Sequence, residues 1–483
     1  MRRLPYYVAL VLMLAHLVSC GEFDSFTTDP SARLSFSTDT VRFDTLISTI
    51  GSSTKTLYVF NGNDEGLRIS SICLQEGSGS HFRVNVDGQF LAGGLGRDFE
   101  VRRKDSIVVR VEVTMPESGT IEAVTYTDNL VFNLESGTSQ KVALRASAMD
   151  AYIVHGMEVT EDMTLQTDKP YVIYDSLVVR EGATLSLSPG TTLMFHDKCG
   201  MEVYGKVLSE GTLDKPVILR GDRTDHMFDY LKYDNTPSRW EGVTIHEGSV
   251  GNRFFHTDLH SGCHGIVCLH QDDGETCVEI ENSIIHNIGG DAFSTKGCKA
   301  VVANTQISNA RGRCVSQTGG TTTFVHCTLA QYYPFTADRG EALFLSDEQG
   351  EWPIRQAHFL SCVITGYGDD VIMGSITDEN APYLFSHCFL NTVVSDDSER
   401  FVSVLYDDTD ETPHGSDNFC HFDSYNFVYD FTPLPTSRIA GAADPSLLEQ
   451  YPTDRLGRMR DEAPDAGCYE FVAKDTEEEG VGG

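Results

Sequence analysis

His256-Thr257-Asp258-Leu259 opens a series of six four-residue segments that share one pattern, and this pattern decides the fold. The other five are Asn282-Ser283-Ile284-Ile285, Asn304-Thr305-Gln306-Ile307, His326-Cys327-Thr328-Leu329, Ser361-Cys362-Val363-Ile364 and His387-Cys388-Phe389-Leu390. Successive segments begin 26, 22, 22, 35 and 26 residues apart, and the fourth position is always Leu or Ile. A repeat of about 22 residues with short strands and sharp corners predicts a parallel β-helix, whose coils pair at a spacing of about 4.8 Å.

Side chains at equivalent positions of such coils stack on one another. The fourth position therefore predicts an internal aliphatic ladder made of Leu259, Ile285, Ile307, Leu329, Ile364 and Leu390. Cys327, Cys362 and Cys388 share the second position, where we expect buried free thiols. Disulfides are the alternative, because the coil spacing lies within their Cα range. Glycines and short strand-like runs before residue 256 extend the pattern to roughly ten coils.

Several segments resemble right-handed β-helix proteins of bacterial surfaces, which have the pectate-lyase-like superfold. They are Gly190-Thr191-Thr192-Leu193-Met194-Phe195, Val203-Tyr204-Gly205-Lys206-Val207 and Trp240-Glu241-Gly242-Val243. Thr453-Asp454-Arg455-Leu456-Gly457-Arg458 and Pro464-Asp465-Ala466-Gly467-Cys468-Tyr469-Glu470 resemble the closing segment of that family. The resemblance implies a right-handed parallel β-helix over residues 151–472. It implies no activity, because these motifs are architectural.

Residues 34–150 have a different sequence pattern, in which apolar and polar residues alternate over short runs. Ile107, Val109, Val111 and Val113 are the clearest case. About seven such strands separated by turn signals predict a β-sandwich, similar to the immunoglobulin-like modules of bacterial surface proteins. The sequence therefore predicts an all-β protein with an N-terminal β-sandwich plus a right-handed parallel β-helix. We expect the sandwich to act as a spacer.

The N-terminus carries the features of a secretory signal. Two arginines precede an apolar run that is too short to span a bilayer. The predicted signal peptide, residues 1–19, ends within the motif Leu17-Val18-Ser19-Cys20-Gly21, just before Cys20. This resembles the bacterial lipobox and implies that Cys20 is diacylated, palmitate being one such chain, and anchors the protein to a membrane. Residues 20–33 would then form the lipidated tether. Glu22 and Asp24 resemble the signals of surface-exposed outer-membrane lipoproteins.

Composition excludes several other classes of protein. The 483 residues include 40% hydrophobic residues, enough for a large core, and the formal net charge is −35. Because 36 basic residues stand against 71 acidic ones, nucleic-acid binding is not expected. Residues 473–483 read as an acidic disordered tail. We expect a monomer.

Two carboxylates are the candidate catalytic residues. Asp369 and Asp370 follow Gly368 and resemble the paired aspartates of β-helical polygalacturonases. Paired carboxylates carry out glycoside hydrolysis, but the other motifs of that family do not follow here. A lyase is the second catalytic alternative, with carboxylate-bound Ca²⁺ and an Arg or Lys base; Arg339, Arg355 and Arg400 are near, but no spacing selects one of them. Cys263, His264, Cys268 and His270 suggest zinc, but strand alternation places Cys263 on the opposite face from the other three, so no metal site is predicted.

Aromatic residues in the corner insertions are the candidate ligand-binding residues. Tyr332, Tyr333, Trp352 and Tyr367 lie near the acidic pairs. Exposed rings stack on the apolar faces of sugars, so these residues favour glycan binding. The function predicted first is a lipid-anchored envelope protein whose β-helix binds a glycan or another surface ligand. A polysaccharide hydrolase or lyase and a purely structural envelope protein are the alternatives. Ca²⁺ is the only cofactor that the sequence leaves open.

Overall fold

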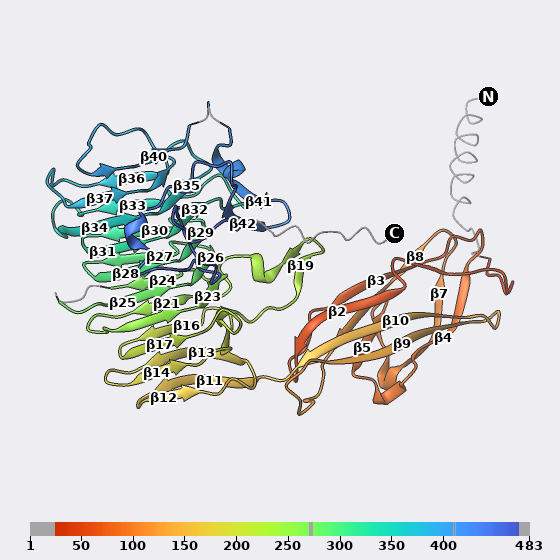
Figure 1. Ribbon diagram of the computed structural model, residues 1–483. Helices are drawn as coiled ribbons and strands as arrows, with labels where there is room; N and C mark the ends of the chain where they lie inside the picture. Colours follow the sequence, from red (N-terminus) through yellow and green to blue (C-terminus); the bar gives the residue numbers. More distant parts are fainter. Residues whose placement is uncertain (1–24, 270–273, 409, 411, 473–483) are drawn as a thin grey trace, which may run out of the picture. The chain divides into compact units, whose positions relative to one another are not determined.

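The computed structural model describes residues 25–269, 274–408, 410 and 412–472, and its regular secondary structure is almost entirely β-strand (Figure 1). The chain divides into two compact units between Asp150 and Ala151. The first unit holds two mainly antiparallel sheets and the second holds long parallel sheets, which confirms the predicted fold class. Cys20 and residues 473–483 lie outside the described residues. Among the described residues, no helix has the length and apolarity needed to cross a membrane.

The first unit is a sandwich of two five-stranded sheets. One sheet has the order β1 (Ser35–Phe36), β3 (Lys55–Phe60), β8 (Ser106–Val113), β5 (Phe82–Val86) and β6 (Gln89–Phe90). The other has the order β2 (Thr40–Ile47), β10 (Ser139–Met149), β9 (Val124–Leu134), β4 (Leu67–Leu74) and β7 (Leu95–Val101). The alternation expected from the sequence is present in β8, where Ile107, Val109, Val111 and Val113 are all buried.

The second unit is a parallel β-helix whose coils contribute strands to three parallel ladders. The first ladder comprises β11 (Tyr152–Val159), β13 (Tyr171–Val179), β15 (Thr192–Phe195), β18 (Val217–Gly221), β23 (Thr257–His260), β26 (Ile284–Ile288), β29 (Gln306–Ala310), β32 (Thr328–Gln331), β35 (Val363–Gly366), β38 (Phe389–Leu390) and β40 (Leu405–Tyr406). The second continues β11 and β13 through β16 (Gly200–Val203), β21 (Gly242–Ile245), β24 (Ile266–Cys268), β27 (Phe293–Lys296), β30 (Val315–Thr318), β33 (Leu343–Ser346) and β36 (Ile372–Ser375).

The third ladder is a separate ten-stranded sheet. Its strands are β12 (Met163–Leu165), β14 (Thr184–Leu187), β17 (Lys206–Glu210), β22 (Asn252–Phe255), β25 (Val278–Glu281), β28 (Lys299–Ala303), β31 (Gly320–Val325), β34 (Ile354–Leu360), β37 (Tyr383–Ser386) and β39 (Phe401–Val402). Among the described residues, two hairpins, β19 (His226–Phe228) with β20 (Leu231–Lys232) and β41 (Phe419–Asp423) with β42 (Val428–Pro433), and five short 3-10 turns complete the fold. The turns are η1 (Gly77–Gly79), η2 (Ala92–Gly94), η3 (Tyr233–Asn235), η4 (Gly415–Asn418) and η5 (Pro445–Leu447).

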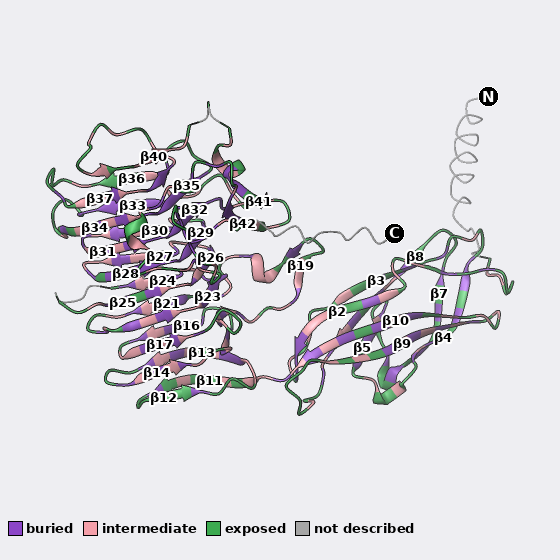
Figure 2. Cartoon of the chain, viewed as in Figure 1, coloured by how far each residue is buried: buried purple, intermediate pink, exposed green. Residues whose placement is uncertain are grey.

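The predicted aliphatic ladder is present and in register. Leu259 pairs with Ile285, and the same column continues through Ile307, Leu329, Ile364 and Leu390. All six side chains are buried inside the coils. Figure 2 shows how much of the β-helix strands is coloured purple for buried residues. Cys327, Cys362 and Cys388 are buried free thiols beside this column. The outer faces of the coils are therefore the surfaces that remain for a ligand.

The first position of the repeat forms the corner between the third and first ladders. His256, Asn282, Asn304, His326, Ser361 and His387 all have positive φ, between 44° and 54°. A single left-handed residue turns the chain sharply, and Asn and His adopt this conformation more readily than most residues. This requirement explains why the first position is polar in all six segments.

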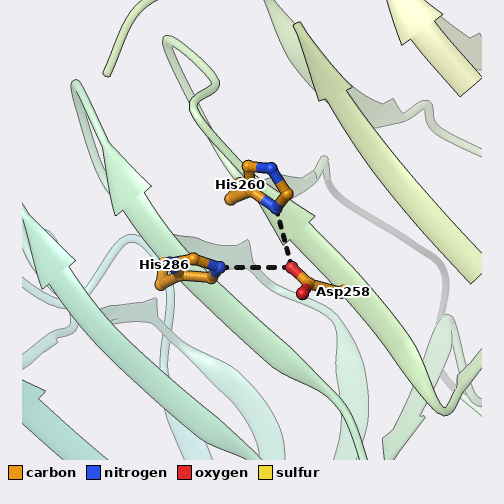
Figure 3. Close-up of side chains that lie close together, drawn as sticks. All are labelled: Asp258, His260 and His286. Carbon is orange, nitrogen blue, oxygen red and sulfur yellow. Dashed lines mark hydrogen bonds and ion pairs between the residues drawn. The ribbon is translucent and has the colours of Figure 1, made fainter. Parts of the chain in front are cut away.

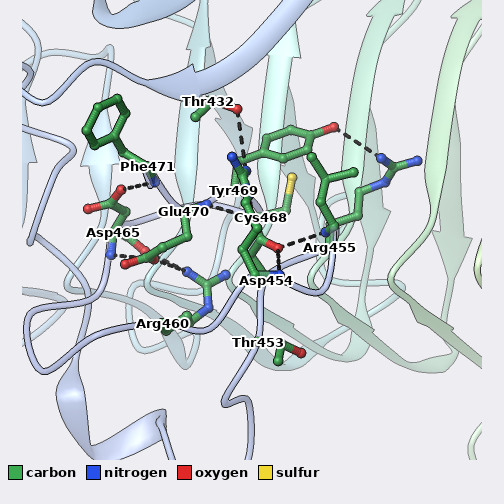
Figure 4. A network of polar contacts seen from close by, with 12 residues as sticks. Thr432, Thr453, Asp454, Arg455, Arg460, Asp465, Cys468, Tyr469, Glu470 and Phe471 are labelled. Carbon is green, nitrogen blue, oxygen red and sulfur yellow. Dashed lines mark hydrogen bonds and ion pairs between the residues drawn. The ribbon is translucent and has the colours of Figure 1, made fainter. Parts of the chain in front are cut away.

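Residues 453–471, the closing segment, run along the outside of the β-helix (Figure 4). The backbone N–H of Gly467 donates to the Ser361 carbonyl at 2.8 Å, and the Arg455 guanidinium donates to the Ser283 carbonyl at 3.1 Å. Buried Arg460 pairs with Glu470 at 3.1 Å and donates to the Asn304 side chain at 3.1 Å. The segment thus connects several coils through polar contacts and covers part of the first ladder.

Candidate functional site

Asp369 and Asp370 lie together on an exposed corner between β35 and β36. The Asp370 carboxylate accepts hydrogen bonds from the Thr392 hydroxyl at 2.5 Å and from the Ile372 backbone at 3.3 Å. A glycosidase needs two carboxylates on opposite sides of a bound sugar. The corner is open to solvent, so the structure adds nothing to the catalytic role predicted for this pair, which stays a prediction.

Tyr332 and Tyr333 were expected to present exposed rings, and this expectation is wrong. Tyr332 is only 1% exposed, because it packs edge-on against Tyr367 and Phe422 and its hydroxyl pairs with Thr365 at 3.0 Å. Tyr333 is 4% exposed. Tyr332 therefore belongs to the core between the β-helix and the β41–β42 hairpin.

Tyr367 and Trp352 occupy different places on the β-helix. Tyr367 is 42% exposed, after β35. Trp352 is half-buried in the corner between β33 and β34, where the Lys296 ammonium lies 5.1 Å from its ring centre. The structure therefore does not gather the four predicted aromatic residues into one site.

Tyr367 instead lines a cavity of about 460 Å³ together with residues from two other segments. Its lining residues are Tyr333, Pro334, Phe335, Thr336, Ala337, Arg339, Tyr367, Ser424 and Tyr425. Tyr333 to Arg339 belong to the insertion between β32 and β33, and Ser424 and Tyr425 belong to the β41–β42 hairpin. Phe335 is 38% exposed and Tyr425 is 73% exposed, so three accessible rings surround the cavity. We call it the aromatic cavity.

Arg339 connects the aromatic cavity to a second one. Its guanidinium lies 4.6 Å from the centre of the Tyr367 ring and donates to the Thr336 carbonyl at 3.1 Å. Among the residues that the structure describes, no carboxylate forms an ion pair with Arg339. This arginine is therefore a charged group with free donors beside the exposed rings.

The second cavity, of about 430 Å³, is bordered by charged side chains. Arg311 pairs with Asp338 at 3.4 Å, and Arg313 pairs with Glu341 at 3.0 Å. Arg339 lines this cavity too, so the two cavities adjoin. Together they offer stacking surfaces at one end and hydrogen-bonding groups at the other. We call the pair the ligand groove.

A separate cluster of titratable groups lies on the outer face of β23 and β26 (Figure 3). The Asp258 carboxylate contacts His260 Nδ1 at 2.8 Å and His286 Nε2 at 3.2 Å. His260 Nε2 contacts Asp234 of η3 at 2.8 Å, and Arg220 of β18 pairs with the same Asp234 oxygen at 2.9 Å. Asp258, His260 and His286 offer three ligand atoms within 4.8 Å of one another.

The carboxylates decide the protonation of this cluster. Burial alone would lower the pKa of His260, but Asp258 and Asp234 raise it to about 9. Burial opposes ionisation of Asp258, yet His260 and His286 hold the pKa of its carboxyl well below the ordinary value. The protein without a bound ion therefore carries an imidazolium between two carboxylates at neutral pH.

Sequence reasoning missed this cluster, although the repeat contained the signal. Aligning the coils places His260 and His286 at the same position of adjacent coils, two residues after Asp258 and Ile284. The sequence search for ligands followed the cysteines instead. In the groove, the sequence indicates Tyr333 and Tyr367, but it cannot indicate Tyr425, because only the folded hairpin brings that residue to the cavity.

Comparisons with known proteins give no family. No protein-family model matches the chain, and no curated protein matches it. Solved structures that share part of the chain include the VesB protease of Vibrio cholerae, at 14% identity over 24% of this chain and 31% of that one, with a TM-score of 0.18. A family 123 glycoside hydrolase from Clostridium perfringens shows 6% identity over 26% and 30%, with a TM-score of 0.18. Dex49A from Penicillium minioluteum shows 10% identity over 78% and 73%, with a TM-score of 0.15.

The chain spans about a third of the length of the VesB protease structure. All three TM-scores lie far below 0.5, so these likenesses carry no argument about activity. The function has to be argued from the groove.

Proposed function

We propose that this protein is a lipid-anchored envelope protein whose β-helix binds a glycan in the ligand groove. One observation carries the proposal: Phe335, Tyr367 and Tyr425 come from three separate segments and surround one cavity with Arg339. A volume of about 460 Å³ lies within the range usual for ligand sites. Sugar rings have apolar faces that stack on aromatic rings, while their hydroxyls need the polar groups beside them.

Arg339 favours a glycan that carries a carboxylate. It has donors available next to the rings, whereas Arg311 and Arg313 of the adjoining cavity are already paired with Asp338 and Glu341. A guanidinium binds a carboxylate through two parallel hydrogen bonds. The net charge of −35 repels a dense polyanion at long range, which favours a glycan with widely spaced uronic acids.

A binding assay on the detergent-extracted full-length protein tests this proposal. Calorimetric titration with neutral and uronic-acid oligosaccharides should identify a ligand, and Tyr367→Ala should weaken it about tenfold, since a lost ring contact costs about 1.5 kcal/mol. Tyr58→Ala is the matched control, because Tyr58 is 46% exposed on the sandwich. Equal affinities for the two variants would contradict binding in the groove.

A cleavage assay with the same glycans distinguishes a hydrolase, a lyase and a protein without activity. Each polymer is incubated with the protein, with Ca²⁺ or with a chelator, and fragment masses are followed. Cleavage that Asp370→Asn abolishes would assign an enzyme, and unsaturated products would identify a lyase. Absence of both binding and cleavage would favour the purely structural role.

The anchor is proposed from the lipobox at Cys20, and residues 20–33 would tether the sandwich to the outer membrane. Labelling cells with a palmitate analogue should mark the wild-type protein, and Cys20→Ala should lose both the label and the membrane fraction. Protease treatment of intact cells then tests whether the protein faces outward. A labelled Cys20→Ala protein would contradict lipidation at this residue.

A further inference from the structure

We propose that Asp258, His260 and His286 form a binding site for a divalent transition-metal ion of the zinc class on the outer face of the β-helix. The three residues come from the neighbouring strands β23 and β26, and none of them belongs to the ligand groove. The inference is therefore independent of the proposed glycan binding.

The ligand atoms are already close to the separation that a metal imposes. Asp258 Oδ1 lies 2.8 Å from His260 Nδ1 and 3.2 Å from His286 Nε2, and all three atoms lie within 4.8 Å of one another. Tetrahedral zinc with ligands at about 2.0–2.1 Å places them roughly 3.3 Å apart. Two of the three separations are thus within about half an ångström of this value, and the third, between the two imidazole nitrogens, is at most 4.8 Å.

The backbone holds these ligands in place before any ion binds. Asp258 pairs with Ile284 and His260 pairs with His286 in the parallel ladder, so the two imidazoles lie on successive coils, tilted by 39° with ring centres 4.9 Å apart. Sites on strands are more rigid than sites on loops, and rigidity lowers the cost of binding. The wild-type fold therefore supplies the ligand geometry without rearranging a loop.

Asp234 provides the outer partner that metal-binding histidines require. It accepts from His260 Nε2 at 2.8 Å and is itself held by Arg220 at 2.9 Å. This contact fixes the imidazole so that Nδ1 faces the ion. In the metal-free protein, His260 Nδ1 donates its proton in a hydrogen bond to the Asp258 carboxylate. When the metal ion binds, it replaces this proton, which is released to solvent, while the proton on Nε2 stays hydrogen-bonded to Asp234.

The three ligand side chains determine which class of metal ion the site would bind. Two imidazoles with one carboxylate suit zinc and similar ions, whereas Ca²⁺ takes oxygen ligands. Asp258 and His286 have side chains that are 32% and 23% exposed, so an ion bound there is reachable from solvent. Three protein ligands leave a fourth position open to water or to an oxygen of a bound molecule, as in catalytic zinc sites.

Cobalt spectroscopy on the full-length protein, stripped with a chelator, tests the site. Co²⁺ should give the visible absorption of a tetrahedral nitrogen- and oxygen-ligated ion at one equivalent, and Zn²⁺ should displace it. His286→Ala and Asp258→Asn should lose this spectrum, whereas His264→Ala, which removes an exposed histidine outside the cluster, should retain it. Asp234→Asn should weaken affinity about 10- to 100-fold without abolishing binding.

Two results would overturn the proposal, and neither depends on how well the variants fold. One is a wild-type protein that binds neither Co²⁺ nor Zn²⁺ at micromolar concentrations, which would leave the cluster as a charge network only. The other is a sulfur-to-cobalt charge-transfer band, which would assign the ion to cysteines; Cys420→Ser, which removes an exposed thiol, would locate it. Glycan titrations with and without Zn²⁺ keep the two proposals distinguishable.

Discussion

At the scale of single residues, Asp347 shows how one buried carboxylate organises a corner of the β-helix. It is 1% exposed and accepts hydrogen bonds from the backbone and hydroxyl of Thr377, at 2.6 and 2.7 Å, and from the backbone of Asp378 at 3.1 Å. Burial opposes ionisation, but these hydrogen bonds prevail and lower the pKa of Asp347 to about 2. The corner after β33 is therefore joined to the corner after β36 through one ionised group.

This geometry predicts a pH dependence of stability with a definite sign. The pKa of Asp347 in the folded protein lies below the ordinary value of 3.8. The stability that its ionised carboxylate adds to the fold is therefore complete above pH 3.8 and is lost as the pH falls toward 2. Thermal unfolding followed from pH 6 to pH 3 should show a smaller loss of Tm for Asp347→Asn than for the wild type. Glu351→Gln, which changes an exposed carboxylate in the same corner, should keep the wild-type slope. Parallel profiles for Asp347→Asn and the wild type would contradict this role.

At the scale of elements, the sequence repeat predicted the coils of the β-helix, and the same repeat explains the aliphatic column that fills their interior. The column from Leu259 to Leu390 could be aligned by eye because a two-residue period leaves only one register that buries the aliphatic residues. The insertions could not be placed in the same way. The sequence suggests that Tyr332 is a surface aromatic, but the β41–β42 hairpin covers it, and nothing local in the sequence indicates a contact 90 residues away.

The closing segment is the element whose stability can be tested most sharply. Arg460 and Glu470 are 0% and 3% exposed, so Arg460→Met leaves a buried carboxylate without its partner and should cost about 3–5 kcal/mol in urea unfolding. Adding Glu470→Leu should recover much of that loss. The exposed pair Arg68 and Glu100 is the control, where removing one partner should cost about 1 kcal/mol or less. Similar losses at the two pairs would show that the closing segment does not stabilise the β-helix.

At the scale of the whole molecule, the sequence predicted the architecture far better than the site. Strand periodicity, repeat spacing and turn residues act locally, so they can be read without a structure. The ligand groove joins an insertion, a corner and a hairpin that lie far apart in the chain, and Tyr425 enters it only through folding. The histidine cluster is the intermediate case, because His260 and His286 share a position of the repeat, while Asp234 reaches them from η3.

The central claim is that a glycan binds between Phe335, Tyr367 and Tyr425, and hydroxyl-radical footprinting of the full-length protein tests it most directly. With a saturating oligosaccharide ligand, we predict that oxidation of these three exposed side chains falls, while oxidation of Tyr58 and Tyr204, which are exposed elsewhere, stays unchanged. Unchanged oxidation of Phe335, Tyr367 and Tyr425 at a ligand concentration that saturates binding would contradict the claim.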